Sequence, residues 1–368
     1  MLVVFLLGLL FLSFRAARFP FVRRLVRGRA LHGRLLCLAA FAAASAGLWL
    51  LWGMMSTLVA LLHLVVIWLF CELLVFVAQK PLKKLLKKQE IGHFAGYAAL
   101  ILCALYLAAG RAAAYDVRET CYTLETDKLD RGLRIVQIAD AHIGTTLGGE
   151  ALAEYIEKIN ALSPDVVALT GDFVDDDTSA EELMRACEAL GQLQARHGVF
   201  FVFGNHDLGY YDEELRGWTG AQLRCALTEN GVTILEDSAA LIDEHFYIVG
   251  RRDRSAEQRG SGRKTAAKLL DGLAHDKYMV VLDHQPTDFD ALAAAGADLV
   301  LCGHTHGGQF FPIQGVVKRL GGNNLCYGLE RREDTDFIVS SGISNWAFHF
   351  RTGSFSEYVV IDISPRRP

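Results

Sequence analysis

The sequence predicts an α/β domain preceded by an α-helical transmembrane region. Apolar blocks fill the first 110 residues, and after them short runs of Val, Ile, Leu and Phe alternate with stretches of helical periodicity. Charge divides at the same point, with 12 Lys/Arg and two acidic residues in 1–110, against 25 basic and 40 acidic residues afterwards. We therefore expect a helical region at 1–110, a linker and entry strand at 111–130, and a folded domain at 131–368.

Four apolar blocks make up the first region. Residues 35–55, 57–77 and 91–110 each reach the roughly 20 residues that cross a bilayer as a helix. Residues 1–14 are short for a span, yet they lack the basic start and small-residue cleavage site of a signal peptide. We interpret them as a first, short membrane helix, so the sequence predicts a multi-pass region of about four helices.

Basic residues between the blocks give the orientation. Seven Arg lie within 15–34 and five Lys within 80–88, whereas the turn at 53–56, "GMMS", has no charge. Because Lys and Arg collect in short cytoplasmic loops, both basic loops are expected inside the cell (inner) membrane and the C-terminal domain outside it. Alternatively, residues 80–88 form an interfacial amphipathic helix, which also favours the anionic cytoplasmic leaflet. The five Cys outside the blocks, odd in number and without a CxxC pair, argue mildly against an oxidising exterior.

The second region reads as buried strands alternating with helices. Five short apolar runs are typical of buried strands, and they lie at 133–140, 165–172, 198–207, 278–286 and 297–306. Between the first three runs lie two segments, 149–162 and 179–193, whose apolar residues have helical spacing. Two more strands are expected at 334–344 and 354–364. This alternation predicts an α/β fold. The acidic balance makes nucleic acid an unsuitable partner, because such binding needs a basic surface.

Each of the five strands ends in a polar cluster: "DAH", "GD", "GNHD", "DHQP" and "GHTHGGQ". Because sites in α/β folds form at the carboxyl ends of strands, these clusters are expected to converge. Asp140 and His142 stand two residues apart, as do His304 and His306, and on extended chain such pairs point the same way. Nitrogen and oxygen donors without thiolate favour Mn, Fe or Zn. Seven such donors suit two divalent ions that share one carboxylate. The other three donors are Asp172, Asn205 and His284.

The ordered set of motifs resembles the calcineurin-like metallophosphoesterase family, in its membrane-anchored bacterial branch, over roughly residues 133–363. The resemblance implies a four-layer α-β-β-α sandwich. It also implies a ligand for each of two ions: Asp140, His142 and His306 for the first, Asn205, His284 and His304 for the second, and Asp172 as the bridge. Turn formation by the aspartates and a structural role for the isolated His284 are the alternative readings.

The same resemblance implies a reaction in which a metal-bound hydroxide attacks phosphorus. His206 would stabilise phosphoryl oxygens or protonate the leaving group, and Asp207 would orient the His206 ring. Substrate contacts are expected from Arg251, Arg254 and Arg351, since a guanidinium can grip a phosphate. A solvated charge cluster is an equally good reading of Arg251 and Arg254.

The sequence thus predicts a membrane-anchored hydrolase of lipid or lipid-linked phosphoesters, because tethering raises the local concentration of such substrates. An extracytoplasmic nucleotide phosphodiesterase is the alternative enzyme. A non-catalytic binding or sensor protein is a third reading, since fold alone does not establish function. Glu72, inside the third block, is a functional candidate because carboxylates are rare within membrane spans.

Overall fold

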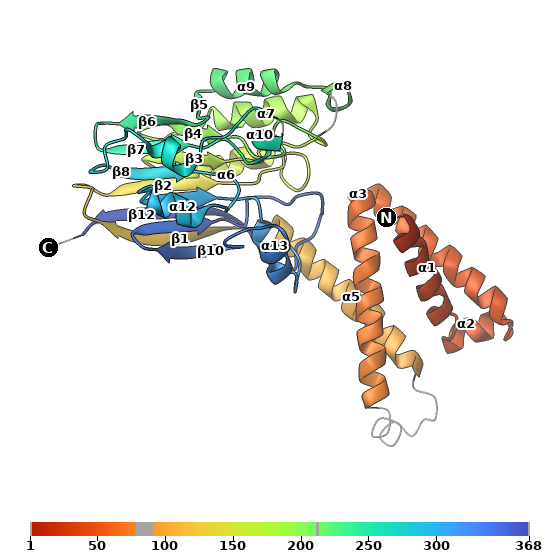
Figure 1. Cartoon of the computed structure of the whole chain (residues 1–368). Coiled ribbons are helices and arrows are strands. Elements are labelled where there is room, and N and C mark those ends of the chain that lie inside the picture. Colours follow the sequence, from red (N-terminus) through yellow and green to blue (C-terminus); the bar gives the residue numbers. More distant parts are fainter. Residues whose placement is uncertain (1, 79–91, 211–212, 259, 367–368) are drawn as a thin grey trace. The chain divides into compact units, whose positions relative to one another are not determined.

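The computed structural model describes residues 2–78, 92–210, 213–258 and 260–366 (Figure 1). The chain forms two compact units: Met1–Ala112 with Ala347–Phe350, and Ala113–Trp346 with Arg351–Pro368. The basic segment expected at 80–88, together with Ile91 and Tyr211, lies outside the described residues.

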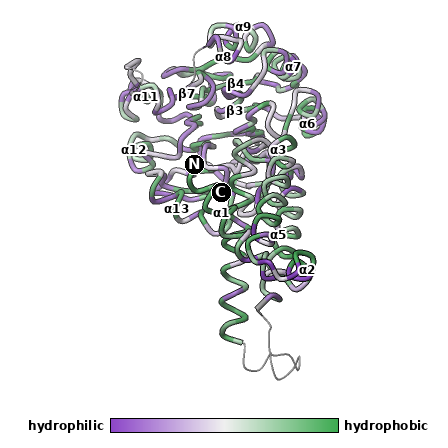
Figure 2. Tube along the Cα trace, turned by 90° about the vertical axis from the view of Figure 1, so that its right-hand side faces the viewer, coloured by the Kyte–Doolittle hydropathy of each residue, from purple (hydrophilic) through white to green (hydrophobic). Residues whose placement is uncertain are grey.

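The first unit is helical. It contains α1 (Leu2–Ala16), α2 (Pro20–Leu25), α3 (Ala30–Val77) and α5 (Gly92–Tyr115). Within α3, Gly53 has φ 76° and ψ 169°, so this helix is two helices joined at the expected "GMMS" turn. In the described part of the chain, Ala30–Val77 and His93–Tyr115 are long and apolar enough to cross a membrane, and α1 is shorter. Figure 2 shows the hydrophobic character of these helices.

Glu72 forms an ion pair within this helical unit. Its carboxylate lies 2.8 Å from Arg15 Nη2, and the indole of Trp68 donates to it at 3.0 Å. Trp68 is almost fully buried in the cluster that also holds Leu12 and Phe19. The pair therefore links α1 to α3, and it shows that α1 packs as part of the helical unit.

The second unit contains two six-stranded sheets. The first sheet has the order β1-β12-β2-β3-β4-β5, and the second β10-β11-β9-β8-β7-β6. The strands of the first sheet are β1 (Val117–Thr126), β2 (Leu133–Ile138), β3 (Val166–Thr170), β4 (Val199–Val202), β5 (Val232–Ile234) and β12 (Ser356–Pro365). Those of the second are β6 (Ser238–Ile242), β7 (Phe246–Gly250), β8 (Tyr278–Leu282), β9 (Leu299–Cys302), β10 (Gly328–Arg332) and β11 (Thr335–Val339).

Helices cover the outer face of each sheet. α6 (Gly149–Ala161), α7 (Ala180–Leu190) and α9 (Gly220–Glu229) share a buried cluster with the first sheet. α11 (Ala266–Leu270) and α12 (Phe289–Ala294) do the same for the second. A third cluster, from Ile135 and Val202 to Leu282 and Leu301, fills the space between the sheets. The four-layer α-β-β-α sandwich is therefore confirmed.

The five expected strands are β2, β3, β4, β8 and β9, and they place the polar clusters together. In β3, β4, β8 and β9 every residue is buried, as expected for strands covered on both faces. β2, β3 and β4 run parallel, as do β7, β8, β9 and β11. Their carboxyl ends consequently open at one edge of each sheet, where the site forms. The remaining helices are short: α8 (Glu213–Arg216), α10 (Ser255–Gln258), the 3-10 turn η1 (His306–Gly308) and α13 (Gln314–Leu320).

Candidate dinuclear metal site

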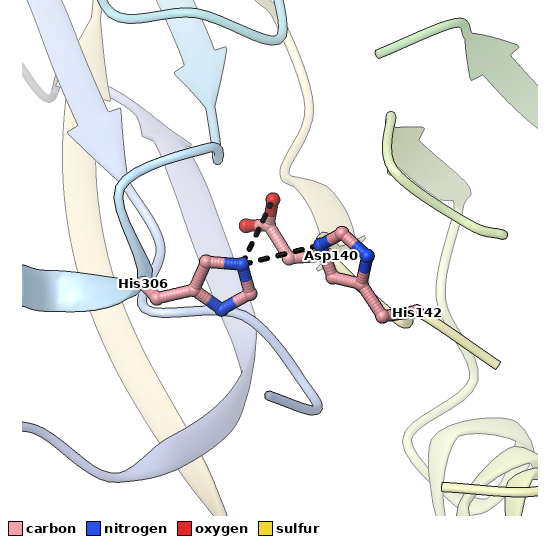
Figure 3. Close-up of side chains that lie close together, drawn as sticks. All are labelled: Asp140, His142 and His306. Carbon is pink, nitrogen blue, oxygen red and sulfur yellow. Dashed lines mark hydrogen bonds and ion pairs between the residues drawn. The ribbon is translucent and has the colours of Figure 1, made fainter. Parts of the chain in front are cut away.

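Asp140, His142 and His306 form the first cluster (Figure 3). Asp140 and His142 follow β2, while His306 follows β9 on the other sheet. The Nε2 atoms of His142 and His306 lie 3.2 Å apart, and His306 Nε2 is 4.0 Å from a carboxylate oxygen of Asp140. All three residues are buried. Three donor atoms therefore point at one small volume.

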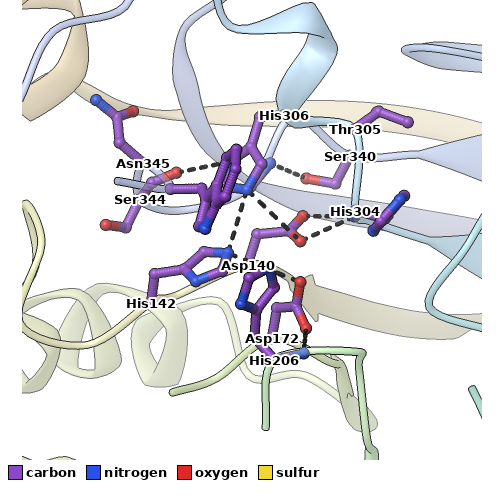
Figure 4. Close-up of polar contacts among 12 residues, drawn as sticks. Asp140, His142, Asp172, His206, His304, Thr305, His306, Ser340, Ser344 and Asn345 are labelled. Carbon is purple, nitrogen blue, oxygen red and sulfur yellow. Dashed lines mark hydrogen bonds and ion pairs between the residues drawn. The ribbon is translucent and has the colours of Figure 1, made fainter. Parts of the chain in front are cut away.

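Asp172, His284 and His304 form the second cluster. His284 Nε2 lies 3.0 Å from Asp172 Oδ2 and 3.1 Å from Asn205 Oδ1, so the amide oxygen joins this group. The same Asp172 oxygen is 3.8 Å from His142 Nε2. Asp172 thus reaches a histidine of each cluster, as expected of a bridging carboxylate. Figure 4 shows Asp172 near Asp140 and His142 of the first cluster.

The backbone at the ligands is left-handed. Asp140 has φ 52° and His142 has φ 35°, and positive φ recurs at Asp172, His304 and His306. β2 ends at Ile138 and β9 at Cys302, so these pairs do not lie on extended chain. The expected reason for their convergence was therefore wrong, and tight bends after the strands bring them together. Non-glycine residues in this region cost of order 1 kcal/mol or more each, and such strain concentrates at functional sites.

Glycines allow the loops that carry the ligands to approach each other, within the first sheet at Gly204 and between the two sheets at Gly303. A Cβ on Gly204 would lie 2.2 Å from Asp172 Oδ1, and a Cβ on Gly303 would lie 2.6 Å from Asp140 Oδ2. Both distances are impossible for real atoms, so any side chain at either position would displace a candidate ligand.

Hydrogen bonds fix the orientation of the histidines. His142 Nδ1 lies 3.0 Å from Asp175, and His284 Nδ1 lies 2.8 Å from the Thr170 carbonyl. In each ring, bonding at Nδ1 leaves Nε2 as the free donor atom for a cation. Asp175 was not predicted as a site residue. The cluster "GDFVDDD" was the available signal, but it did not show which of its aspartates faces His142.

Asp207 occupies a different place from the one expected. Oδ1 accepts from the amides of Phe173 and Val174, and Oδ2 accepts from those of Asp172 and Gly204. Four amides use the four lone-pair positions of the carboxylate. Asp207 therefore shapes the loop that carries Asp172, and no acceptor position remains with which to orient the His206 ring.

His206 borders the cluster and is only partly buried. Its backbone amide donates to Asp172 Oδ1 at 2.8 Å. Its ring lies 5.1 Å from that of His142, 5.0 Å from Tyr210 and 5.6 Å from Trp346. Burial lowers its pKa below the ordinary value, so the ring is neutral at neutral pH. It is positioned to meet a group bound at the two clusters.

Two of the three arginines expected to bind substrate are buried in the protein's own polar contacts. Arg251 is 3% exposed and bonds to Asp283, Asp288 and the Lys264 carbonyl.

Arg351 is fully buried. It bonds to Asn345 and to the carbonyls of Ser341, Ser344 and Phe355, with Nη2 3.3 Å from His306 Nδ1. The guanidinium groups of Arg251 and Arg351 are therefore both occupied by contacts within the protein. The prediction that these two arginines bind substrate directly was wrong. Arg254 is exposed and stays a candidate.

Burial and neighbouring charges shift the pKa values of the ligands in different directions. Burial raises the pKa of Asp140 to about 6, and burial lowers the pKa of His284 but Asp172 brings it well above its ordinary value. Burial alone raises the pKa of Asp172, but His284, followed by other neighbouring histidines, brings it well below its usual range. Burial, then the charges of His142 and Arg351, hold the pKa of His306 well below its ordinary value. Asp172 is therefore anionic and His306 neutral, the forms that bind a metal.

The donor set fits two divalent ions. Imidazole nitrogens, carboxylates and one amide oxygen match Mn, Fe or Zn, and oriented Nδ1 atoms complete the arrangement usual around metal ligands. All seven residues predicted as ligands are in these two clusters. That these ions are Mn, Fe or Zn stays a prediction from the donor types.

Comparison with known proteins agrees with this site. The family model described as calcineurin-like phosphoesterase matches residues 133–308. An uncharacterized metallophosphoesterase of Aquifex aeolicus is 30% identical over 68% of this chain and 92% of its own length. A metallophosphoesterase of Campylobacter jejuni, also uncharacterized, is 30% identical over 66% of this chain and 62% of its own. A Danio rerio protein named transmembrane protein with metallophosphoesterase domain is 33% identical over 62% of this chain and 53% of its own length.

The chain belongs to the calcineurin-like metallophosphoesterase family. It spans only about half to three fifths of several of these relatives, from 51% to 62% of their length. The matched part contains every residue of the two clusters.

Proposed function

We propose that this chain is a metal-dependent phosphoesterase that acts on a lipid or lipid-linked phosphoester. The observation that carries the proposal is the pair of clusters sharing Asp172, whose oxygen lies 3.0 Å from His284 and 3.8 Å from His142. Two divalent ions held there would polarise the phosphoryl oxygens and lower the pKa of water.

The protein's own residues prepare this chemistry. Asp140 and Asp172 supply negative charge in a buried site, while Asp175 and the Thr170 carbonyl hold two imidazoles in one tautomer. His206, beside the clusters and neutral, donates an N–H hydrogen bond towards the phosphoryl group or the leaving oxygen. Tyr210 accepts from the Asn205 amide at 2.9 Å and thereby turns the Asn205 carbonyl oxygen towards His284.

The lipid substrate is supported by the helical unit. Two of its described helices have the length and composition of membrane spans, and two relatives are named as transmembrane proteins. Membrane anchoring keeps the site near lipid-borne esters. We extend this to a multi-pass protein of the cell membrane with the phosphoesterase domain outside, which a reporter fused after residue 368 would test. Cytoplasmic reporter activity would contradict that orientation.

The decisive test uses the purified full chain with a chromogenic phosphodiester and the matching monoester, with and without manganese. We expect metal-dependent turnover that is lost in His206→Ala and Asp172→Asn. Micellar lipid phosphoesters should then be better substrates than nucleotides. Equal or better nucleotide turnover would favour the extracytoplasmic nucleotide phosphodiesterase, and bound metal without turnover of any ester would favour a binding protein.

A further inference from the structure

The segment after the last two candidate ligands has an unusual surface. We define the α13 surface as Phe311, Ile313, Val316, Lys318, Arg319 and Leu320. α13 contains no buried residue. Three apolar members of this surface are exposed, Leu320 at 84%, Val316 at 50% and Ile313 at 38%. Val316 and Leu320 are four residues apart and share one face of the helix.

The charge on this segment is opposite to that of the rest of its unit. From Gly307 to Leu329 there is no Asp or Glu, although residues 111–368 carry 40 acidic and 25 basic residues. Lys318 and Arg319 are exposed at the end of α13. A Cβ on Gly322 would lie 3.8 Å from Arg254 Nη1, so a third cation stands beside the same helix end.

The α13 surface is attached directly to the site. Gln314 donates to the carbonyl of Gly307, at 3.1 Å, and to that of Gly353. Gly307 belongs to η1, the turn that begins with the candidate ligand His306. Whatever the α13 surface rests on is therefore next to the metal site.

We propose that the α13 surface docks on an anionic lipid bilayer and brings the metal site to the level of the headgroups. Exposed aliphatic side chains beside basic ones are the pattern of helices that lie in a membrane interface, and juxtamembrane cations are attracted to anionic lipids. The bilayer is favoured over a protein partner because this chain already contains helices with the composition of membrane spans. The inference rests on the proposed function where it takes a lipid phosphoester as substrate, but membrane contact can be measured by itself.

The test uses the full chain in vesicles of phosphatidylglycerol and phosphatidylcholine whose acyl chains carry bromine, a contact quencher of tryptophan. Leu320→Trp is compared with the parent protein, so that the added emission is isolated. Met184→Trp, on α7, is the matched control because Met184 is also an exposed apolar helix residue, at 42%. We expect brominated lipid to quench at least half of the added emission of Leu320→Trp and almost none of that of Met184→Trp.

Several outcomes would overturn the docking. They are an unquenched Leu320→Trp, equal quenching at the two positions, and an added emission that is blue-shifted in detergent and unquenched in vesicles. The last would mean that a second copy or another part of the chain covers the surface. A further variant tests the role of charge. Lys318→Glu and Arg319→Glu, introduced together into Leu320→Trp, should reduce the quenching of its added emission several-fold.

Failure of the docking and failure of the proposed function give different results. Quenching at Leu320→Trp without turnover of any lipid phosphoester supports docking and contradicts the lipid substrate. Turnover of lipid phosphoesters without quenching supports the proposed function and overturns the docking.

Discussion

His142 and His306 face each other with their Nε2 atoms 3.2 Å apart, although they come from different sheets. His142 is held at Nδ1 by Asp175, and His306 lies beside Arg351. Two imidazoles so arranged repel if both are protonated, and both offer lone pairs if both are neutral. A divalent cation held between them and Asp140 would resolve this conflict.

Removal of metal should lower both activity and stability. Chelation would leave Asp140, Asp172 and their histidines buried without a cation, and an ion that binds only the native state adds about 4 kcal/mol at a thousand times its Kd. We expect two metal ions per chain by elemental analysis, a clear fall in Tm after chelation, and recovery with manganese or zinc. An unchanged Tm after complete removal of metal would contradict a dinuclear site.

Substitution of His206 should affect the reaction more than the metal content. Its ring is beside the clusters and is not needed to complete either of them. We expect His206→Asn to keep both ions and to lose about 10²–10⁴-fold in kcat on an alkyl phosphoester. A neutral ring donates an N–H hydrogen bond to a phosphoryl oxygen and not a proton to the leaving group, so the loss should be similar on a p-nitrophenyl ester. A much smaller loss on the p-nitrophenyl ester, whose leaving group needs no proton, would instead assign His206 to protonation of the leaving group.

The pH profile follows from the lowered pKa of His206. An acid that must be protonated loses activity as pH rises through its pKa, and here that pKa lies below the ordinary 6.5. A neutral ring that donates its N–H hydrogen is unaffected in that range. We expect wild-type kcat on the alkyl phosphoester, whose leaving group would need a proton from an acid, to stay flat between about pH 7 and 8. A fall across that interval that is absent in His206→Asn would contradict the neutral ring.

Asp207 should be needed for the shape of the site. Its carboxylate accepts four backbone amides, including that of Asp172. In Asp207→Asn, an NH2 group would face N–H donors, and an unsatisfied buried donor costs about 1–3 kcal/mol. We expect lower Tm, loss of at least one ion and more than about 100-fold lower activity. The control Asp243→Asn, at an exposed carboxylate, should behave as wild type, and a metal-replete, active Asp207→Asn would contradict the assigned role.

The Arg15–Glu72 pair should stabilise the helical unit. Breaking a buried pair leaves one charge uncompensated, which costs about 3–5 kcal/mol when burial is complete, and less for these partly exposed side chains. Arg15→Gln and Glu72→Gln should each lower the Tm of the detergent-solubilised protein, and the double variant should lower it by less than their sum. Turnover of a soluble ester should persist. Normal Tm with lost activity would instead give Glu72 a functional role, as expected of a carboxylate within a membrane span.

Comparison of particular elements shows what the sequence could and could not predict. Buried strands such as β3 and β9 were predictable because nearly every position is apolar, Thr170 being the exception. The seven ligands were predictable because they follow such strands. The hydrogen-bond and ion-pair partners that come from distant loops could not be predicted. Nothing in the pattern near Arg251 shows that Asp283 and Asp288 enclose it, and nothing in "GNHD" shows that Asp207 faces backbone amides. Local periodicity specifies an element, whereas the direction of a loop side chain depends on φ, as at His304, where φ is 73°.

Arg351 should act on one metal position and not on the other. It bonds to the carbonyl of Ser344 and lies beside His306 Nδ1, on the side of the first cluster. Positioning residues of this kind commonly change metal affinity by 10–100-fold. We expect Arg351→Lys to retain the ion at Asp172, His284 and His304 and to lose most of the other, as measured by titration with elemental analysis. Arg254→Lys, at an exposed arginine, is the matched control and should retain both ions. Equal weakening of both positions in Arg351→Lys would mean that Arg351 supports the whole fold instead of orienting His306.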